Sequence, residues 1–456
     1  MARDADDATP ISSRRELVER LESGVKNSGQ LRVGTEHEKI AFHKATNGPV
    51  DYDNRGIRAL IEGLEASLGW TAIEDEGHPI GLYDPQGGGA ISIEPGGQFE
   101  LSGAPLASVH ETKRELDAHF DAVAAVAGPL DISFLDLGAS PKWSRAETPV
   151  MPKQRYRIMA DYMPKVGALG LDMMFRTATI QANLDFTSEA DMVKKFRAGL
   201  ALQPVATALF ANSPFLDGKP TGALSQRSAI WRDTDAARTG MLPFVFEDGM
   251  GFERYVDYAL DVPMYFVKRA GVYHDVAGAS FHDLLAGRLP QLPGERATAS
   301  DWANHLSTIF PEVRLKTYLE MRGADGGPPA HILALPALFV GLFYDSSALD
   351  AALDLVSDWT AEEREALRAA VPFQALETRI KSRSLREVAL DVLALAKDGL
   401  RRRALRDASG ADESLYLGPL EAIAQSGKPL AAERLDAYNG RWKKSVEPAF
   451  EECVLL

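Results

Sequence analysis

Cysteine is almost absent from this chain of 456 residues, in which Cys453, close to the end, is the only one. A single thiol excludes an intramolecular disulfide and a zinc site built from several cysteines. It also leaves no cysteine nucleophile within a conventional local motif. Disulfides within the chain and sulfur-rich metal sites are therefore excluded.

Long apolar runs are missing as well. No stretch approaches the roughly 20 apolar residues that a membrane-spanning helix needs. The first residues, Met1 to Asp7, are acidic and resemble neither a secretory signal nor an Arg-rich organellar transit peptide. We therefore expect a protein of the reducing cytoplasm with no membrane partner.

Basic residues are outnumbered, since 50 Lys and Arg stand against 65 Asp and Glu, a formal charge of −15. Such a surface repels nucleic acid, so the expected partners are small molecules, although a local basic pocket can still hold a nucleotide. Hydrophobic residues make up 45% and charged residues 25%, as in ordinary globular proteins. The length predicts one large elaborated domain or two fused lobes.

The pattern of apolar residues predicts strands bracketed by helices and followed by a helical tail. Helices are expected at 12–26, 54–68, 105–126, 152–163 and 188–210, and strands at 31–42, 131–138, 172–186 and 313–322, with short strands within 72–102. From residue 329 onward the spacing is almost wholly helical. This order favours an α+β fold with a mainly antiparallel sheet. Gly87-Gly88-Gly89 lacks the Lys-Ser/Thr of a P-loop and is expected to be a turn.

Three of the expected strands carry polar side chains on a single face, because residues two apart in a strand share a face. Glu36 and Glu38 share theirs with Ile40 and Phe42. The other two sets are Thr177, Thr179, Gln181, Asn183 and Asp185, and Arg314, Lys316, Tyr318, Glu320 and Arg322. An antiparallel sheet with one hydrated face gives the same alternation, and for the Thr177 set this explanation is equally good. Two glutamates on an otherwise apolar face instead indicate a bound cation.

Further carboxylates flank a Pro-Gly-Gly turn. Glu94 and Glu100 lie on either side of it, a pattern that a plain hairpin with exposed glutamates also gives. Together with Glu36, Glu38 and Glu320 they make five glutamates on β segments, which in a chain without metal-binding cysteines favours magnesium or manganese over zinc. Carboxylates facing a basic set are suited to metal-assisted phosphoryl transfer; that basic set is Arg155, Arg227, Lys316 and Arg322. His37, between two of the glutamates, faces away from them and is expected to be structural.

Eight stretches carry a resemblance to a known family: 33–39, 93–103, 155–156, 161–164, 170–177, 181–186, 261–266 and 318–325. In these stretches the chain resembles the plant-type and proteobacterial class of glutamate–cysteine ligases, collinearly from about residue 30 to about 325. The resemblance implies a glutamine synthetase-like catalytic sheet that forms a funnel and is shared distantly with guanidino kinases. It divides the chain into an N-terminal helix (1–29), a catalytic α+β domain (30–328) and a mainly helical C-terminal region (329–456).

The resemblance also implies a reaction, in which ATP phosphorylates the γ-carboxylate of L-glutamate and the amine of L-cysteine captures the γ-glutamyl phosphate. The products are γ-glutamylcysteine, ADP and phosphate, in the first step of glutathione synthesis. A related ligase that uses another amine, a catalytically inactive binding protein and a guanidino kinase remain alternatives. Glutathione is expected to compete at the glutamate site.

Site roles carry over by position. Glu36, Glu38, Glu94, Glu100 and Glu320 resemble the set that binds Mg²⁺, for which Mn²⁺ could substitute. Arg155 and Arg322 are the expected catalytic residues; Arg155, Arg227 and Tyr265 are expected to bind the amino acids; and Gln181, Asn183, Lys316 and Arg322 are expected near the phosphates. Plant members carry regulatory cysteine pairs that this chain lacks, so we expect no intramolecular thiol switch.

Overall fold

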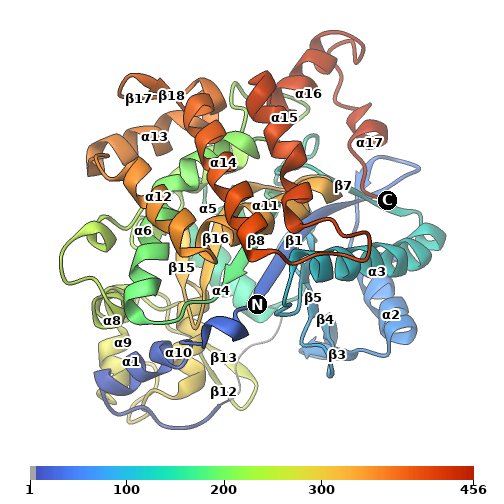
Figure 1. Ribbon diagram of the computed structural model, residues 1–456. Coiled ribbons are helices and arrows are strands. Elements are labelled where there is room, and N and C mark those ends of the chain that lie inside the picture. Colours follow the sequence, from blue (N-terminus) through green and yellow to red (C-terminus); the bar gives the residue numbers. More distant parts are fainter. Residues whose placement is uncertain (1–6) are drawn as a thin grey trace.

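The computed structural model describes residues 7–456, so nearly all of the acidic start of the chain lies outside the described residues. Its centre is a ten-stranded sheet in the order β15-β16-β8-β1-β6-β5-β4-β3, with β2 and β7 also paired to β1 (Figure 1). The strands of this sheet are β1 Val33–His43, β2 Gly48–Pro49, β3 Thr71–Asp75, β4 His78–Tyr83, β5 Ala90–Ile93, β6 Phe99–Ser102, β7 Ile132–Leu135, β8 Thr179–Leu184, β15 Val313–Leu315 and β16 Leu319–Asp325. All of these pairings are antiparallel. The prediction of an α+β fold with a mainly antiparallel sheet is confirmed.

Helices flank the sheet. They are α1 Arg14–Glu22, α2 Ile57–Leu68, α3 Val109–Ala127, α4 Gln154–Tyr162, α5 Gly170–Arg176, α6 Glu189–Leu209, α7 Gln226–Ile230, α8 Phe252–Asp261, α9 Phe281–Leu285, α10 Ala299–Ser307, α11 Pro329–Phe343, α12 Ser346–Val356, α13 Ala361–Gln374, α14 Leu385–Arg403, α15 Gly418–Ser426, α16 Leu430–Asn439 and α17 Ala449–Glu452. Four two-stranded pieces lie outside the large sheet: β9 Phe215–Leu216 with β10 Lys219–Pro220, β11 Thr239–Gly240 with β14 Phe310–Pro311, β12 Phe266–Arg269 with β13 Val272–Asp275, and β17 Arg379–Ile380 with β18 Arg383–Ser384. In Figure 1 the helices from α11 to α16, coloured orange to red, gather at one side of the sheet, and α8 to α10 lie toward the other end.

One face of the sheet is covered by α6 and α11. Ile180, Ala182 and Leu184 of β8 point into the large apolar core on this side. Because side chains alternate along a strand, Thr179 and Gln181 point to the opposite face. The sheet therefore has one apolar face under helices and one polar face.

Helix α11 is apolar all round because it lies between the sheet and α14. Gly341 and Gly399 allow the two helices to approach, since a Cβ on Gly399 would lie 1.9 Å from the carbonyl oxygen of Gly341. No helix within residues 7–456 is by itself long and apolar enough to cross a membrane. In this described part of the chain, one pair of helices, α11 and α12, passes that test when taken together, and the two are bent by 93° at their junction.

Strand β1 changes partners half-way along its length. Up to Lys39 it pairs with β8 and β6, and from Ile40 it pairs with β7. Ile40 and Phe42 alternate along β1 in step with Glu36 and Glu38. They pack, however, in a separate core with Trp442 and Phe450. Their apolar environment is therefore made by the C-terminal segment.

Two of the expected strands are wrong in their extent. The segment 172–186 was expected to be extended throughout, but its start belongs to helix α5, in which Asp172 and Arg176 form an ion pair at helical spacing with a distance of 3.1 Å. The segment 313–322 is a hairpin, β15 followed by β16, because the chain turns at 316–318. The turn brings Arg314 opposite Glu320, so the predicted shared face survives.

Candidate active site

A cavity opens on the polar face of the sheet, over β1, β6, β8 and β16. Eight of the residues expected in the site line it: Glu36, Glu38, Glu94, Glu100, Arg155, Gln181, Arg227 and Arg322. Segments as distant in sequence as β1 and β16 meet here because β8 lies between them in the sheet. The structure thus gathers most of the expected residues around one space.

The acidic wall of this cavity consists of Glu36, Glu38, Glu94 and Glu100. In the pairing of β1 with β6, Glu38 stands directly opposite Glu100, so both carboxyl groups leave the same face. Glu36 stands opposite Gln181 of β8. Glu94 follows β5 at the start of the Pro-Gly-Gly turn.

The turn that carries Glu94 depends on its two glycines. Gly97 has a φ of 85°, a left-handed conformation that favours glycine. A Cβ on Gly96 would lie 2.2 Å from the carbonyl oxygen of Phe175, so the turn packs against the end of α5. Glycine at both positions lets Glu94 and Glu100 reach the same cavity.

Neutral groups donate hydrogen bonds to all four carboxylates of the acidic wall. Asn183 Nδ2 lies 2.7 Å from Glu36 Oε1, and the backbone N–H of Thr179 lies 3.1 Å from Glu38 Oε2. Ser92 and Ser102 donate to Glu100 at 2.6 and 2.9 Å, and the Tyr156 hydroxyl donates to Glu94 at 3.2 Å. These bonds orient the carboxylates without supplying positive charge.

Burial dominates the electrostatics of the two β1 glutamates. It raises the pKa of Glu38 well above the ordinary value, and the charges of Glu94 and Glu100 raise it further. The pKa of Glu36 is also raised, by burial first and then by the charges of Glu320 and Glu100. Two buried carboxyl groups held among other acids fit a bound cation, which would favour their ionised form.

The donor set of the acidic wall fits magnesium or manganese, because every atom offered is an oxygen. Within residues 7–456, however, no three Asp, Glu, His or Cys side chains converge tightly enough to hold a metal ion as they stand. The side chains of the acidic wall would therefore have to turn toward one another around the ion.

The opposite wall is basic and includes Arg155 from α4, Arg227 from α7, Arg314 from β15 and Arg322 from β16. Arg322 donates to Gln181 Oε1 at 2.6 Å. The Arg155 guanidinium lies 5.3 Å from the centre of the Phe266 ring. These guanidinium groups are mostly buried, so their charges act in a region with little water.

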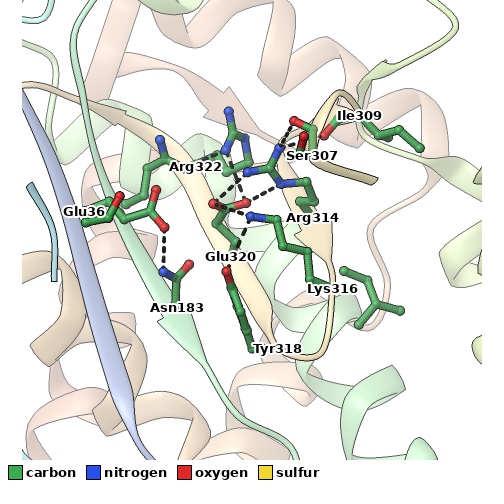
Figure 2. A network of polar contacts seen from close by, with 12 residues as sticks. Glu36, Asn183, Ser307, Ile309, Arg314, Lys316, Tyr318, Glu320 and Arg322 are labelled. Carbon is green, nitrogen blue, oxygen red and sulfur yellow. Dashed lines mark hydrogen bonds and ion pairs between the residues drawn. The ribbon is translucent and has the colours of Figure 1, made fainter. Parts of the chain in front are cut away.

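Glu320 is fully buried. Figure 2 shows it among Arg314, Lys316 and Arg322. Arg314 grips both of its oxygens, with Nη2 2.8 Å from Oε1, while Arg322 and Lys316 stand at 3.2 and 3.6 Å. Although burial alone would raise its pKa, the three positive charges hold the pKa of Glu320 well below the usual range. A metal ion could reach Glu320 only if Arg314 released one oxygen.

Asn183 lines a second cavity, together with Lys26, Arg32, Gly34, Gly103 and Tyr318. Glu36 lines both cavities, so the two meet at its carboxyl group. Asp185, also on this face, is held by Lys26 and by the backbone N–H of Arg32, each at 2.7 Å. The polar face of β8 is thus shared between two neighbouring spaces.

Besides Glu320, two expected site residues line neither cavity. Tyr265 is 1% exposed, and its ring centre lies 3.9 Å from the Arg238 guanidinium. Lys316 points at Glu320, and its pKa is lowered to about 8 by burial and by the charge of Arg314. In this structure both lie behind the residues that line the cavities.

His37 points away from the acidic wall, as its place between the two glutamates predicts. It is buried against α3, where Nδ1 lies 3.1 Å from Lys39 Nζ and its ring meets that of His119 edge-on. Burial and the Lys39 charge hold its pKa well below the usual value. It is a structural residue in this fold.

Several lining residues escaped the sequence-based assignment. Arg314 shared a predicted face but received no role, and Tyr156 follows Arg155 within a recognised stretch. Trp231, Ser307 and Phe310 gave no signal, because nothing in their local sequence separates them from ordinary core or surface residues. Only the folded chain brings them to the basic wall.

The family model of glutamate–cysteine ligase family 2 matches residues 32–452. The chain is 55% identical over 447 residues to the chloroplastic glutamate–cysteine ligase of Arabidopsis thaliana, covering 98% of this chain and 84% of that protein. This chain belongs to glutamate–cysteine ligase family 2. Its identity to the chloroplastic enzyme of Medicago truncatula is 54% over 451 residues, covering 99% of this chain and 87% of that protein.

Among solved structures, the glutamate–cysteine ligase of Francisella tularensis in complex with AMP shares the fold of this family member. The TM-score is 0.56 at 13% sequence identity, covering 94% of this chain and 88% of that one. The glutamine synthetase-like fold class is thereby confirmed.

The same relatives correct one expectation. A cytoplasmic location was predicted, but the relatives from A. thaliana, Brassica juncea, M. truncatula and Nicotiana tabacum are all named chloroplastic. The prediction is wrong because the acidic composition of a few leading residues does not decide the compartment.

Proposed function

We propose that this family member joins the γ-carboxylate of L-glutamate to the amine of L-cysteine with hydrolysis of ATP to ADP and phosphate. The product is γ-glutamylcysteine, the first intermediate of glutathione synthesis. The observation that carries the proposal is one cavity in which Glu36, Glu38, Glu94 and Glu100 face Arg155, Arg227 and Arg322. Membership of family 2 supplies the reaction class.

The acidic wall is the proposed magnesium site, with Mn²⁺ as a substitute. Glu36, Glu38, Glu94 and Glu100 would hold the ions, and Glu320 would join them only after Arg314 has moved. Bound magnesium would neutralise phosphate charge and polarise the phosphate that is transferred. The raised pKa values of Glu36 and Glu38 support this assignment.

The ATP phosphates are proposed to lie where the two cavities meet, next to Glu36. Gln181 and Arg322 line the first cavity there, Asn183 lines the second, and Lys316 reaches toward Glu320 beside them. Gly34 and Gly103 line the second cavity, which is proposed to hold the nucleoside. The nucleoside would thus extend away from the acidic wall.

The arginines of the basic wall bind and orient the reactants. Arg155 and Arg227 would hold substrate carboxylates, since a guanidinium can donate two parallel hydrogen bonds to a carboxylate. A γ-carboxylate oxygen attacks the γ-phosphorus, and the bond to ADP breaks. The cysteine nitrogen then attacks the acyl carbon, phosphate leaves with the bonding electron pair, and the amine proton is lost to it. Arg322 lies where it stabilises the charge on the transferring group.

Glutathione is proposed as a competitor for the same site. Its γ-glutamyl end carries the α-carboxylate and α-amine that free glutamate presents. The basic wall would therefore bind it in place of glutamate.

An amino-acid panel tests the function. The purified full chain, given ATP and Mg²⁺, should release ADP and phosphate only when both glutamate and cysteine are present. Release that needs glutamate but not cysteine would assign a different amine. A stable phosphorylated amine, with no free phosphate, would indicate a kinase instead.

A further inference from the structure

Asp325 closes the strand that carries Glu320 and Arg322, yet it lies outside both cavities. It is 1% exposed and accepts three hydrogen bonds. Asn212 N–H and Ser213 Oγ donate to Oδ2 at 2.8 and 2.6 Å, and Ser225 Oγ donates to Oδ1 at 2.7 Å. All three donors are neutral, so the aspartate charge is not balanced within its own hydrogen bonds.

Ser213 and Ser225 connect Asp325 to helix α7 by hydrogen bonds. Ser213 Oγ accepts from the backbone N–H of Arg227 at 3.1 Å, and Ser225 Oγ accepts from that of Ser228 at 3.1 Å. Both N–H groups belong to the first turn of the helix, whose donors have no partner within the helix itself. Asp325 therefore fixes the start of α7 through two hydroxyl groups.

Arg227 is held by the same strand at its other end. Its Nη2 donates to the backbone carbonyl of Arg322 at 2.9 Å, and its guanidinium stacks near Trp231. Among the acids that favour its charged form, Asp325 contributes more than Glu38, while burial lowers the pKa of Arg227. Both the backbone and the guanidinium of Arg227 are thus held in place by hydrogen bonds that lead to β16.

We propose that Asp325 is a positioning residue for substrate binding, which sets the place of Arg227 through Ser213 and Ser225. The inference rests on the proposed function, in which Arg227 holds a carboxylate of the amino-acid substrate. One strand then fixes two arginines of the basic wall: Arg322 by its own position and Arg227 by this relay. Glutamate affinity, more than nucleotide affinity, depends on it.

The variant Asp325→Asn separates charge from shape. Its amide oxygen can still accept from Asn212 and Ser213, and its NH₂ group can donate to Ser225, which keeps its bond from Ser228. Because hydrogen bonds to a neutral amide are weaker than those to a carboxylate, the start of α7 should be held less firmly. We therefore expect the KM for glutamate to rise about tenfold while the KM for ATP stays within about twofold. Ser213→Ala and Ser225→Ala, which each remove one relay, should raise the KM for glutamate about threefold to fivefold.

Asp345→Asn is the matched control. Asp345 also holds a helix start, accepting from the N–H of Ala348 at 2.8 Å, but it caps α12 and lines neither cavity. Its variant should keep both KM values. In a second control, Asp325→Asn is added to Arg227→Gln, where it should change kcat/KM for glutamate less than about twofold if it acts through Arg227.

The outcomes separate this inference from the function on which it rests. A wild-type chain without glutamate- and cysteine-dependent turnover refutes the function, and the inference falls with it. An active wild type overturns the inference alone if the KM for glutamate does not change, if both KM values rise together, or if the full effect persists beside Arg227→Gln. Should Asp325→Asn fail to fold, the two serine variants decide by the same criteria.

Discussion

Two glutamates on β1 and one on β16 point to the same polar face of the sheet, but their charges are compensated in opposite ways. On β1, Glu36 and Glu38 receive hydrogen bonds from neutral groups, and burial raises their pKa values. On β16, Glu320 is more deeply buried but is surrounded by three cations, and its pKa is well below the usual range. Glutamate in the same sheet therefore has only neutral hydrogen-bond donors on β1, whereas on β16 its charge is compensated by three cations.

The difference shows what each wall lacks. The acidic wall has four carboxylates whose hydrogen-bond donors are all neutral. Bound cations would therefore balance its negative charge. Beside the basic wall, the Glu320 carboxylate holds Arg314, Lys316 and Arg322 in place. Three cations around one carboxylate leave a net positive charge that suits a phosphate. We propose that a nucleotide with its metal ions, which brings both signs together, occupies the cavity between the walls.

Removing a carboxylate from the acidic wall should give the largest loss of activity. Glu38→Gln keeps the shape but removes a metal ligand, so we expect turnover to fall at least about 10³-fold. Thermal stability without metal should be unchanged or higher, because an uncompensated buried acid is gone. Turnover and melting temperature are compared with those of Glu62→Gln, an exposed glutamate on α2. An active Glu38→Gln would show that Glu38 is not a required metal ligand.

Removing the Glu320 carboxylate should lower the stability of the fold, whereas removing the Glu38 carboxylate should not. Glu320→Gln leaves three buried cations facing a neutral amide, and breaking a buried ion pair costs about 3–5 kcal/mol. The free energy of unfolding, measured in urea without metal, should fall by about that amount. If Glu320→Gln is no less stable than Glu38→Gln, the two walls do not differ in the way described.

Glu115 tests whether burial beside neutral donors is enough to raise the pKa of a carboxyl group. This residue of α3 accepts from the N–H of Ala104 at 2.7 Å, and burial followed by the Asp84 charge raises its pKa to about 7. The folded state then binds an extra proton between pH 4.5 and about 7, so stability falls as pH rises through that window.

Glu115→Gln removes this dependence. The free energy of unfolding of the variant minus that of the wild type should increase by about 1–3 kcal/mol from pH 5 to pH 8. Urea unfolding at several pH values measures the difference, with the exposed Glu62→Gln as a flat control. A constant difference across the range would mean that Glu115 is ionised with its ordinary pKa.

The sequence predicts the parts of the site that lie on regular strands. Alternation placed Glu36 with Glu38 and Gln181 with Asn183 on shared faces, which the structure bears out. Alternation says nothing of neighbouring strands, so the pairing of Glu38 with Glu100 required the sheet order. It also missed the turn within 313–322, although the hairpin preserved the shared face.

Residues whose position depends on tertiary packing were beyond reach. Tyr265 was expected to contact substrate, but stacking against Arg238 places it behind the cavity. Trp231 and Phe310 reach the cavity from short elements with no repeating pattern. The relay from Asp325 joins residues up to 113 positions apart in the chain, a relation that no local pattern contains.

Cys453 gives the smallest expected effect, because the chain carries no second thiol. The side chain is 2% exposed, and burial raises its pKa to about 11 despite the nearby Arg434 charge. Since the thiolate is the reactive form, an aromatic disulfide reagent at pH 8 should label the thiol only after unfolding. Activity should be the same with and without dithiol reductant, and Cys453→Ser should change turnover less than about twofold. A reversible response of the wild type to reductant, lost in Cys453→Ser, would reveal a switch that acts between chains, because a single cysteine cannot form a disulfide within one.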